Sequence, residues 1–263
     1  MLEDLLEKPS SYLLSHSTDE LDAALFERFR NKVKRRLTGE PLAYVLGHCG
    51  FWSLDLNVSP TTLIPRPETE LLVELAIQAY PNQTNINALD LGTGTGAIAL
   101  AIASECSLWK ITATDQSEKI IEVAQSNAQL NCINNVRFGV GSWYQALQGV
   151  EAHSKQGSQA DDKFDLIVSN PPYIEPGDHH LNQGDVRFEP HSALVAQQNG
   201  LADLRHIIDH GQQYLKPAGA LMVEHGYQQG GAVRTLFTAA GFRGVISHKD
   251  LAGHPRVTVG YLA

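Results

Sequence analysis

The segment Asp90-Leu91-Gly92-Thr93-Gly94-Thr95-Gly96 decides the fold. It follows residues 86–91, which predict a buried strand, and precedes the Ala/Ile/Leu run 97–105, which predicts a helix. In α/β proteins a ligand binds at such a place, where a strand ends against a helix N-terminus. The glycines allow a tight turn and a close approach of backbone to ligand. Their spacing is G-x-G-x-G, which differs from the G-x-G-x-x-G of dinucleotide-binding folds.

Strand and helix patterns alternate on both sides of this segment. We expect strands at 86–91, 110–114, 136–140, 164–169, 220–225, 243–248 and 256–262, and helices at 97–105, 117–131, 200–215 and 227–240. This alternation predicts an α/β fold, with a mostly parallel seven-stranded sheet covered on both faces. The last strand follows its predecessor without a helix and could insert antiparallel. Residues 149–163 are polar and patternless, which predicts a mobile loop.

The first forty residues carry a helical pattern. Thr18 with Asp19-Glu20 predicts the helix start, and Gly39 with Pro41 predicts its stop. Between them an apolar residue recurs at every fourth position and forms one stripe: Leu21, Leu25, Phe29, Val33 and Leu37. One helix and a short partner make a small module that must lean on another part of the molecule.

From Gly47 to Pro60 the apolar period changes to two, which predicts a hairpin. Pro65 and Pro67 then hold the chain extended, and Pro67 suits the first turn of a helix that runs to about Tyr80. The predicted organisation is a small N-terminal helical domain (1–42), a β-hairpin linker (43–62) and an α/β domain (63–263).

Composition and charge narrow the function classes. With 43% hydrophobic and 19% charged residues, the 263-residue chain resembles ordinary soluble globular proteins, and it has no apolar run that could span a bilayer. The acidic start Met1-Leu2-Glu3-Asp4 differs from a signal peptide. Cys49, Cys106 and Cys132 are odd in number and far apart, which favours reduced thiols over disulfides or zinc. We expect a cytoplasmic protein without membrane contact.

A net charge of −9 weighs against a nucleic-acid binder, because phosphate neutralisation needs a basic face. One basic cluster stands out: Arg28, Arg30, Lys32, Lys34, Arg35 and Arg36. It fits either a solvated helix face or a docking surface for an acidic or RNA-bound partner.

Two residues after the glycine loop fit a nucleoside. Asp115 ends the predicted strand 110–114, where a carboxylate can accept both hydroxyls of a ribose, although it also fits a helix N-cap. Trp143 follows the strand 136–140 and could lie beside an adenine ring or belong to the core.

Asn170-Pro171-Pro172-Tyr173 follows the strand 164–169. The residue before a proline is pushed out of the helical region, and a proline has no N–H, so the chain leaves the sheet rigidly with carbonyls unpaired. Such a shelf offers acceptors to a planar NH2 group and an aromatic ring to pack on its face. Taken alone, the segment could also be a turn that ends a strand.

Together these motifs resemble a known family. The glycine loop with Asn-Pro-Pro-Tyr is similar to Rossmann-like methyltransferases that use S-adenosylmethionine to methylate amino groups. Leu63–Glu70 (LIPRPETE) and Val186–Pro190 (VRFEP) narrow the resemblance to the PrmC (HemK) family, which methylates the glutamine side-chain amide nitrogen (N5) in the Gly-Gly-Gln motif of peptide chain release factors. The likeness runs from about Gly39 to the C-terminus and includes Gly39-Glu40-Pro41, Phe51-Trp52-Ser53 and His225-Gly226-Tyr227-Gln228-Gln229.

The resemblance implies a class I methyltransferase domain at 63–263, with S-adenosyl-L-methionine as cofactor and S-adenosyl-L-homocysteine as product. The implied cofactor residues are Gly92, Thr93, Gly94, Thr95, Gly96, Asp115, Trp143 and Asn170. The implied substrate residues are Asn170, Pro171, Pro172 and Tyr173, of which Asn170, Pro171 and Tyr173 would be catalytic. The expected partners are release factors, with no direct nucleic-acid substrate; we expect a monomer and no metal site.

Two positions depart from the family pattern. The helical module before Gly39 is shorter than the family usually shows. Ser142 stands before Trp143 where the family commonly has an acid, which would remove or weaken a contact to the adenine amino group.

The chemistry that these residues would perform is mainly positioning, because an amide nitrogen is a poor nucleophile and a sulfonium is a strong electrophile. We expect the Asn170 side-chain oxygen and the Pro171 carbonyl to accept the two amide N–H bonds, while Tyr173 packs on the amide plane. No strong base is required.

Other polar residues are weaker candidates. Arg66 and Glu68 could wall the substrate pocket, or cap a helix and pair on the surface. His206 and His210 have a metal spacing but no third ligand, and the adjacent His179-His180 are expected in a loop.

Three alternative functions are weighed. A methyltransferase for base amines would need a basic groove or a target-reading domain, and the chain shows neither outside residues 28–36. A related enzyme methylates a glutamine of a ribosomal protein. Only the resemblance of the stretch Ile64–Thr69 favours release factors over that substrate. A nicotinamide-dependent oxidoreductase disagrees with the glycine spacing, and a non-catalytic module would not need the Asn-Pro-Pro-Tyr shelf.

Overall fold

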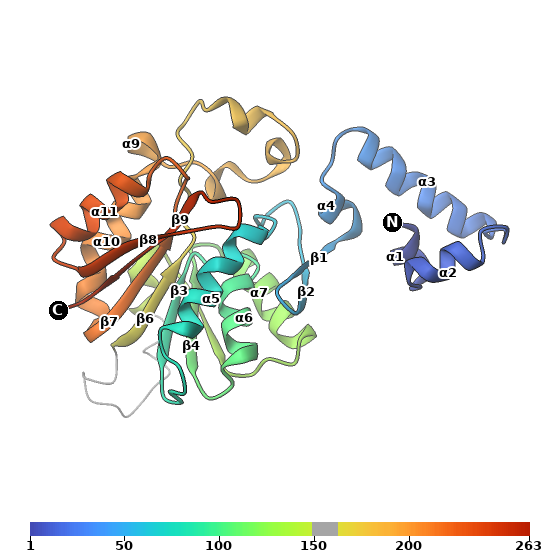
Figure 1. Ribbon diagram of the computed structural model, residues 1–263. Helices are drawn as coiled ribbons and strands as arrows, with labels where there is room; N and C mark the ends of the chain where they lie inside the picture. The colour runs from blue at the N-terminus through green and yellow to red at the C-terminus, as the bar shows by residue number, and fades with distance from the viewer. Residues whose placement is uncertain (149–162) are drawn as a thin grey trace.

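A seven-stranded sheet forms the centre of the computed structural model, which describes residues 1–148 and 163–263. Its strands are β3 (Asn87–Leu91), β4 (Lys110–Asp115), β5 (Val136–Val140), β6 (Phe164–Ser169), β7 (Leu215–Glu224), β8 (Arg243–Lys249) and β9 (Pro255–Tyr261). They lie in the order β5-β4-β3-β6-β7-β9-β8 (Figure 1). Strands β3 to β7 pair in parallel, whereas β9 is antiparallel to both β7 and β8. The predicted sheet and its antiparallel last strand are confirmed.

Helices cover both faces of this sheet (Figure 1). One hydrophobic core lies under α5 (Glu70–Gln78), α6 (Ala97–Glu105) and α7 (Glu118–Leu130), and the other lies under α10 (Ala202–Tyr214) and α11 (Gly230–Ala239). Successive strand residues alternate between the cores: Leu166 and Val168 face the first, and Ile167 faces the second. Burial on both faces explains why these strands are almost continuously apolar.

The predicted start of one strand was wrong. Strand β7 begins at Leu215 rather than near residue 220, because Leu215 pairs with Phe164 before the register shifts. Pro217 and Gly219 between them resemble a turn in the sequence, and Ala218 has a φ of 62°. The predicted loop at 149–163 lies outside the described residues except for Lys163.

The N-terminal part consists of the helices α1 (Leu2–Leu6), α2 (Ser10–Ser15), α3 (Ala23–Leu37) and α4 (Leu42–Leu46). The predicted start at Thr18 was wrong: α3 begins after Asp22, whose carboxylate accepts the Leu25 N–H at 2.8 Å. The apolar stripe is half-buried except at Leu37, which is 81% exposed. Helix α4 was not expected, because five residues after a proline are too short for a periodic pattern.

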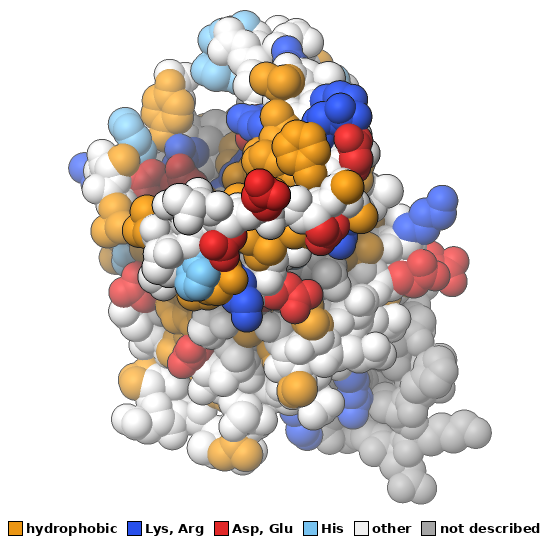
Figure 2. All heavy atoms as spheres, turned by 90° about the vertical axis from the view of Figure 1, so that its right-hand side faces the viewer, with side chains coloured by type: hydrophobic (Ala, Val, Ile, Leu, Met, Phe, Trp, Pro, Cys, Tyr) orange, Lys and Arg blue, Asp and Glu red, His pale blue; other side chains and the backbone are white. Residues whose placement is uncertain are grey.

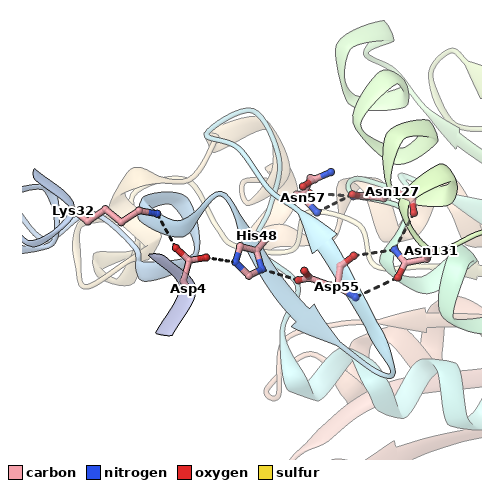
Figure 3. A network of polar contacts seen from close by, with 7 residues as sticks. All are labelled: Asp4, Lys32, His48, Asp55, Asn57, Asn127 and Asn131. Carbon is pink, nitrogen blue, oxygen red and sulfur yellow. Dashed lines mark hydrogen bonds and ion pairs between the residues drawn. The ribbon is translucent and has the colours of Figure 1, made fainter. Parts of the chain in front are cut away.

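The predicted hairpin is confirmed as β1 (His48–Phe51) paired antiparallel with β2 (Leu54–Asn57). It joins the N-terminal helices to the sheet domain through polar contacts (Figure 3). On one side, Asp4 of α1 bonds both Lys32 of α3 at 3.1 Å and His48 at 2.8 Å. His48 in turn contacts Asp55 of β2 at 2.8 Å.

On the other side, the hairpin is held by helix α7 (Figure 3). The Asn127 side chain accepts the Asn57 N–H at 2.7 Å and donates to the Asn57 carbonyl at 3.1 Å. Asn131 makes the same pair of contacts with the backbone of Asp55. The backbone N–H and carbonyl groups of both strand residues are therefore bonded to asparagine side chains of α7, which fixes the hairpin to the sheet domain.

Short 3-10 helices occupy the connections: η1 (Pro67–Thr69), η2 (Trp143–Ala146), η4 (His179–Asn182), η5 (Val186–Phe188) and η6 (His191–Ala193). A single turn, α9 (Gln197–Gly200), precedes α10. Across the described ranges no helix has the length and apolarity that a bilayer crossing needs. The three cysteines are free thiols, as predicted.

Candidate active site

A cavity of about 300 Å³ lies where β3, β4, β5 and β6 end. It is lined by most of the predicted site residues: Gly92, Thr93, Gly94, Thr95, Asp115, Trp143, Asn170 and Pro172. Gly96, Pro171 and Tyr173 do not line it. Gly96 instead stands directly before α6, and a Cβ there would lie 2.9 Å from the Leu100 side chain, so this glycine allows close packing at the helix start. The topology thus gathers residues from Thr61 to Asp203 around one space.

The glycine loop is tied to the neighbouring strand by its own amides. The N–H groups of Gly92 and Thr93 both donate to the Thr114 carbonyl, at 2.9 and 2.8 Å, and the Gly94 N–H donates to Asp115 Oδ2 at 3.1 Å. The Gly96 N–H donates to the Thr93 carbonyl. These groups are therefore unavailable to a pyrophosphate, which counts against a dinucleotide.

Asp115 ends β4 at the cavity wall and is 9% exposed. Burial raises the pKa of its carboxyl, and backbone N–H groups of Gly94, Ser117 and Gln116 oppose that effect. Its remaining lone pairs suit neutral donors such as hydroxyl groups. The structure therefore places the carboxylate where the sequence predicted a ribose contact.

Trp143 lies against the glycine loop in an unusual conformation. Its φ is 47°, in the left-handed region that a bulky residue rarely adopts. A Cβ on Gly92 would lie 3.3 Å from the Trp143 ring, so a glycine lets the indole approach closely. Asp203 also lines the cavity; burial raises the pKa of its carboxyl, and the nearby Trp143 side chain opposes that effect. Ser142 lines the cavity beside it.

Asn170 also lines the cavity. Its Nδ2 donates to the Thr69 hydroxyl oxygen at 3.2 Å. Its Oδ1 accepts no hydrogen bond from the described chain, and neither does the Pro171 carbonyl. Asn170 lines the cavity, so its Oδ1 is open to a ligand that donates N–H bonds. Pro171 is buried beside it and does not line the cavity.

Tyr173 is held from several sides. Its hydroxyl donates to Glu224 Oε1 at 3.3 Å, and its carbonyl accepts the Gln229 side-chain N–H at 2.9 Å. A Cβ on Gly200 would lie 2.0 Å from that carbonyl, so the loop before α10 can pack here only with glycine. Burial raises the pKa of the Tyr173 hydroxyl, which stays protonated.

Of the two weaker candidates Arg66 and Glu68, only Arg66 belongs to the cavity. Arg66 lines the cavity and pairs with the buried carboxylate of Glu189, which also accepts the Ile64 N–H at 3.1 Å. This pair joins the LIPRPETE and VRFEP segments at the cavity wall. Glu68 is exposed and does not line the cavity.

The histidines lie elsewhere. His206 and His210 form a pair on α10, where the ring of His210 bonds the His206 carbonyl at 2.8 Å. His179 and His180 are exposed on η4, and their rings approach Asp178 at 3.4 and 2.8 Å. Their ligand atoms lie within 4.8 Å of one another, away from the cavity.

Four buried or cavity residues were missed in the sequence: Thr69, Glu189, Asp203 and Glu224. Glu224 carried a usable signal, because it follows an apolar strand as Asp115 does. Thr69 and Glu189 lie in the LIPRPETE and VRFEP segments, but their roles were not assigned, since each acts through a partner more than 100 positions away.

Comparison with known proteins agrees with this geometry. Residues 82–248 match the family model of a methyltransferase domain, and residues 1–47 match the PrmC N-terminal domain. The chain is 49% identical to the release factor glutamine methyltransferase of Aliivibrio fischeri, over 99% of this chain and 87% of that protein. The chain belongs to this family. The enzyme of the same name from Pseudomonas aeruginosa is 48% identical, over 100% of this chain and 91% of that protein.

Solved structures show the same fold. A methyltransferase from Pyrococcus furiosus superposes with a TM-score of 0.55 at 20% identity, over 88% of this chain and 98% of that one. The catalytic domain of hMettl16 superposes with a TM-score of 0.58 at 15% identity, over 81% of this chain and 76% of that one. At such identities the likeness concerns the fold alone, which is the class I methyltransferase fold predicted for residues 63–263.

The methyl donor of this methyltransferase is S-adenosyl-L-methionine. The cavity fits such a molecule, because it combines a loop in which four amides are already bonded to the protein, a buried carboxylate at Asp115 and an indole at Trp143. These groups suit a neutral nucleoside with hydroxyl groups and a flat ring.

Proposed function

We propose that the chain methylates the side-chain amide nitrogen (N5) of the glutamine in the Gly-Gly-Gln motif of peptide chain release factors. The observation that carries this proposal is a pair of acceptors without a donor in the described chain, Asn170 Oδ1 at the cavity wall and the adjacent Pro171 carbonyl. The same cavity is also lined by Asp115. A primary amide has two N–H bonds and matches two acceptors. The names of the family members support the same substrate.

The donor end of the site would be held by residues with matched chemistry. Bound S-adenosyl-L-methionine supplies an electrophilic methyl group on a positively charged sulfur. Asp115 would accept hydrogen bonds from the ribose hydroxyls, and the Trp143 indole would lie beside the adenine ring. The loop Gly92–Gly96 would bring the backbone close to the ligand, because it lacks side chains at three positions.

The acceptor end would prepare the substrate amide. Asn170 Oδ1 and the Pro171 carbonyl would each accept one amide N–H and so orient the nitrogen lone pair. Both bonds would strengthen as positive charge develops on that nitrogen, which favours the transition state over the ground state. Pro172 lines the cavity, and Tyr173 would pack on the amide plane and exclude water. A methylated, protonated amide loses its proton readily, so no strong base is needed.

The other parts of the chain would present the substrate. We assign residues 1–42 to a helical docking domain, 43–62 to the hairpin linker and 63–263 to catalysis. Acidic, basic and apolar side chains are interspersed over the face that carries the N-terminal helices (Figure 2). Such a surface suits a protein partner rather than a nucleic acid. We also infer a monomer that works in the cytoplasm, which agrees with the three free thiols.

The proposal is tested by methyl transfer from isotopically labelled S-adenosyl-L-methionine to release factor, ribosomal protein and DNA in parallel. We expect label on the Gly-Gly-Gln glutamine, located by mass mapping and absent when that glutamine is replaced. Label on the ribosomal protein or on DNA instead would overturn the substrate and leave the cofactor assignment standing.

The proposed chemistry predicts a large effect of Asn170→Ala. The kcat should fall by at least about 100-fold, because one of two oriented hydrogen bonds in the transition state is lost. Because Asn170 is also an implied cofactor residue, the affinity for S-adenosyl-L-methionine is measured by calorimetry, and kcat is compared at saturating donor. Near-normal turnover with intact donor binding would refute the role of Asn170.

A further inference from the structure

Glu224 is a buried carboxylate that the proposed chemistry does not use. It is the last residue of β7 and is 1% exposed. Its Oε1 accepts the Tyr173 hydroxyl, whereas its Oε2 is buried without a hydrogen-bond partner in the described ranges. Burial raises the pKa of Glu224 to about 7, against the stabilising effects of Thr69, Tyr173 and Arg256 on the charged form. An acid kept at such a cost needs an explanation.

Thr69 connects this carboxylate to the cavity. It stands directly before α5, where a threonine commonly caps the helix, yet its side chain makes no capping hydrogen bond. Instead its hydroxyl faces Glu224 and favours the ionised form, while its oxygen accepts the Asn170 Nδ2. Thr69 lines the cavity and is only 4% exposed. Bulk water therefore does not compete with Glu224 and Asn170 for its hydroxyl group.

The direction of these bonds follows from the number of protons. A hydroxyl has one proton, and an ionised carboxylate can only accept. If the Thr69 proton goes to Glu224, the Thr69 oxygen must accept, and Asn170 must present its NH2 group to it. The Asn170 oxygen is then the atom left for the substrate. The reverse direction would aim N–H bonds of Asn170 at N–H bonds of the substrate amide.

We propose that Glu224 is a positioning residue for this reaction, which orients the Asn170 amide through Thr69 and anchors the Tyr173 ring through its hydroxyl. The inference rests on the proposed amide methylation. It assigns the unpartnered Oε2 to the Thr69 hydroxyl, and it explains why a threonine before α5 turns away from its helix. The amide end of the site is thus set by side chains on three elements: η1, the segment after β6, and the end of β7.

The decisive variant is Glu224→Gln in the full chain, because it keeps the side-chain shape and replaces one acceptor by an N–H donor. That donor can reverse the Thr69 hydroxyl and so turn the Asn170 amide. We expect kcat for release factor methylation to fall about 10-fold or more, the effect of one misdirected buried hydrogen bond. The KM for release factor and the Kd for S-adenosyl-L-methionine should stay within about twofold, which separates orientation from loss of structure.

Glu70→Gln is the matched control. It makes the same substitution one residue from Thr69, at a carboxylate that accepts the Trp52 N–H and does not line the cavity. We expect it to leave kcat unchanged. A loss of kcat in this control equal to that of Glu224→Gln would overturn the inference, because the effect would then not be specific to the Thr69 pathway.

Thr69 provides the independent test. Thr69→Val removes the hydroxyl at constant shape and should lower kcat as Glu224→Gln does, whereas Thr69→Ser keeps the hydroxyl and should retain most of kcat. The double variant of Glu224→Gln with Thr69→Val should be no worse than the poorer single variant, because both act through one pathway. Losses that multiply, or a normal kcat in Glu224→Gln, would overturn the inference. Failure of the unmodified chain to methylate release factor would overturn the proposed function instead.

Discussion

The two parts of the molecule differ in what holds them together. In the sheet domain, side chains such as Phe237, Leu100 and Ile167 are completely buried between strands and helices. In the N-terminal part, helices α1, α2 and α3 contain no fully buried residue, and Leu14 and Leu37 are about four-fifths exposed. Helices α1 and α3 are attached instead by partly exposed polar contacts such as Asp4 with His48 (Figure 3), and only the short α4 adds a small buried cluster, through Tyr44.

This difference matches what the proposed reaction asks of each part. Bond-making requires Asn170 and Asp115 to be held rigidly, and tight packing under the sheet supplies that rigidity. A docking surface for a second protein needs only a moderate attachment, since relative motion of parts joined by polar contacts is the default expectation. Changes in the two parts should therefore differ in size and in kind.

The largest effect is expected in the core of the sheet domain. Phe237→Ala removes a buried ring that packs edge-on against Phe242, with the two ring centroids 5.2 Å apart. The substitution should lower the free energy of unfolding by about 3–5 kcal/mol. Phe26→Ala is the matched control on α3, where the ring is 50% exposed, and it should cost less than about 0.5 kcal/mol. Chemical denaturation with near-UV and far-UV detection measures both. Equal costs would contradict the contrast between the two parts.

The same contrast explains how much of the fold was predictable. The strand segments were predictable because burial on both faces leaves continuous apolar runs, as in Phe164–Ser169. Helix α6 was found to the residue, since Gly96 ends the loop and an apolar run follows. The N-terminal helices were harder to place, because a half-buried stripe extends through Leu21, which lies outside α3.

The candidate site was predictable where it depends on local chain geometry and not where it depends on distant contacts. The glycine loop, Asp115 and Asn170 each stand at a strand end, so the parallel sheet itself brings them together. Thr69 meets Asn170 across 101 positions, and no pattern in either segment encodes that hydrogen bond. Asp203 meets Trp143 in the same way, through the placement of α10.

A smaller effect is expected at the attachment of the N-terminal helices, and it should depend on pH. Hydrogen bonds to Asp4 and Asp55 raise the pKa of His48 above its ordinary value of 6.5. The stabilisation from protonated His48 is therefore complete below about pH 6.5 and is lost as the pH rises through the raised value. His48 is 37% exposed, so solvent screening limits the change to less than about 1 kcal/mol.

Hydrogen exchange of α1 and α3 between pH 6 and pH 9, corrected for the intrinsic exchange rate, measures this change. His48→Gln can still hydrogen-bond one of the two acids but does not titrate, so the pH dependence should flatten while protection of α6 stays constant. An unchanged pH dependence in that variant would assign the effect to another group.

The smallest effect is expected at the ion pair between α3 and the segment before η5. Asp185 accepts from Arg36 at 3.2 Å, and both side chains are more than two-fifths exposed. Asp185→Ala should lower the free energy of unfolding by at most about 0.5 kcal/mol, because exposed ion pairs are weak and Arg36 retains its bonds to the Gly39 and Glu40 carbonyls.

Glu27→Ala breaks an equally exposed pair within α3 and serves as the control. Local exchange in residues 179–188 should rise only in Asp185→Ala, since that pair alone of the two connects the N-terminal helices to the active-site side of the sheet domain. A loss of stability near that of Phe237→Ala would show that the N-terminal helices are held as firmly as the core.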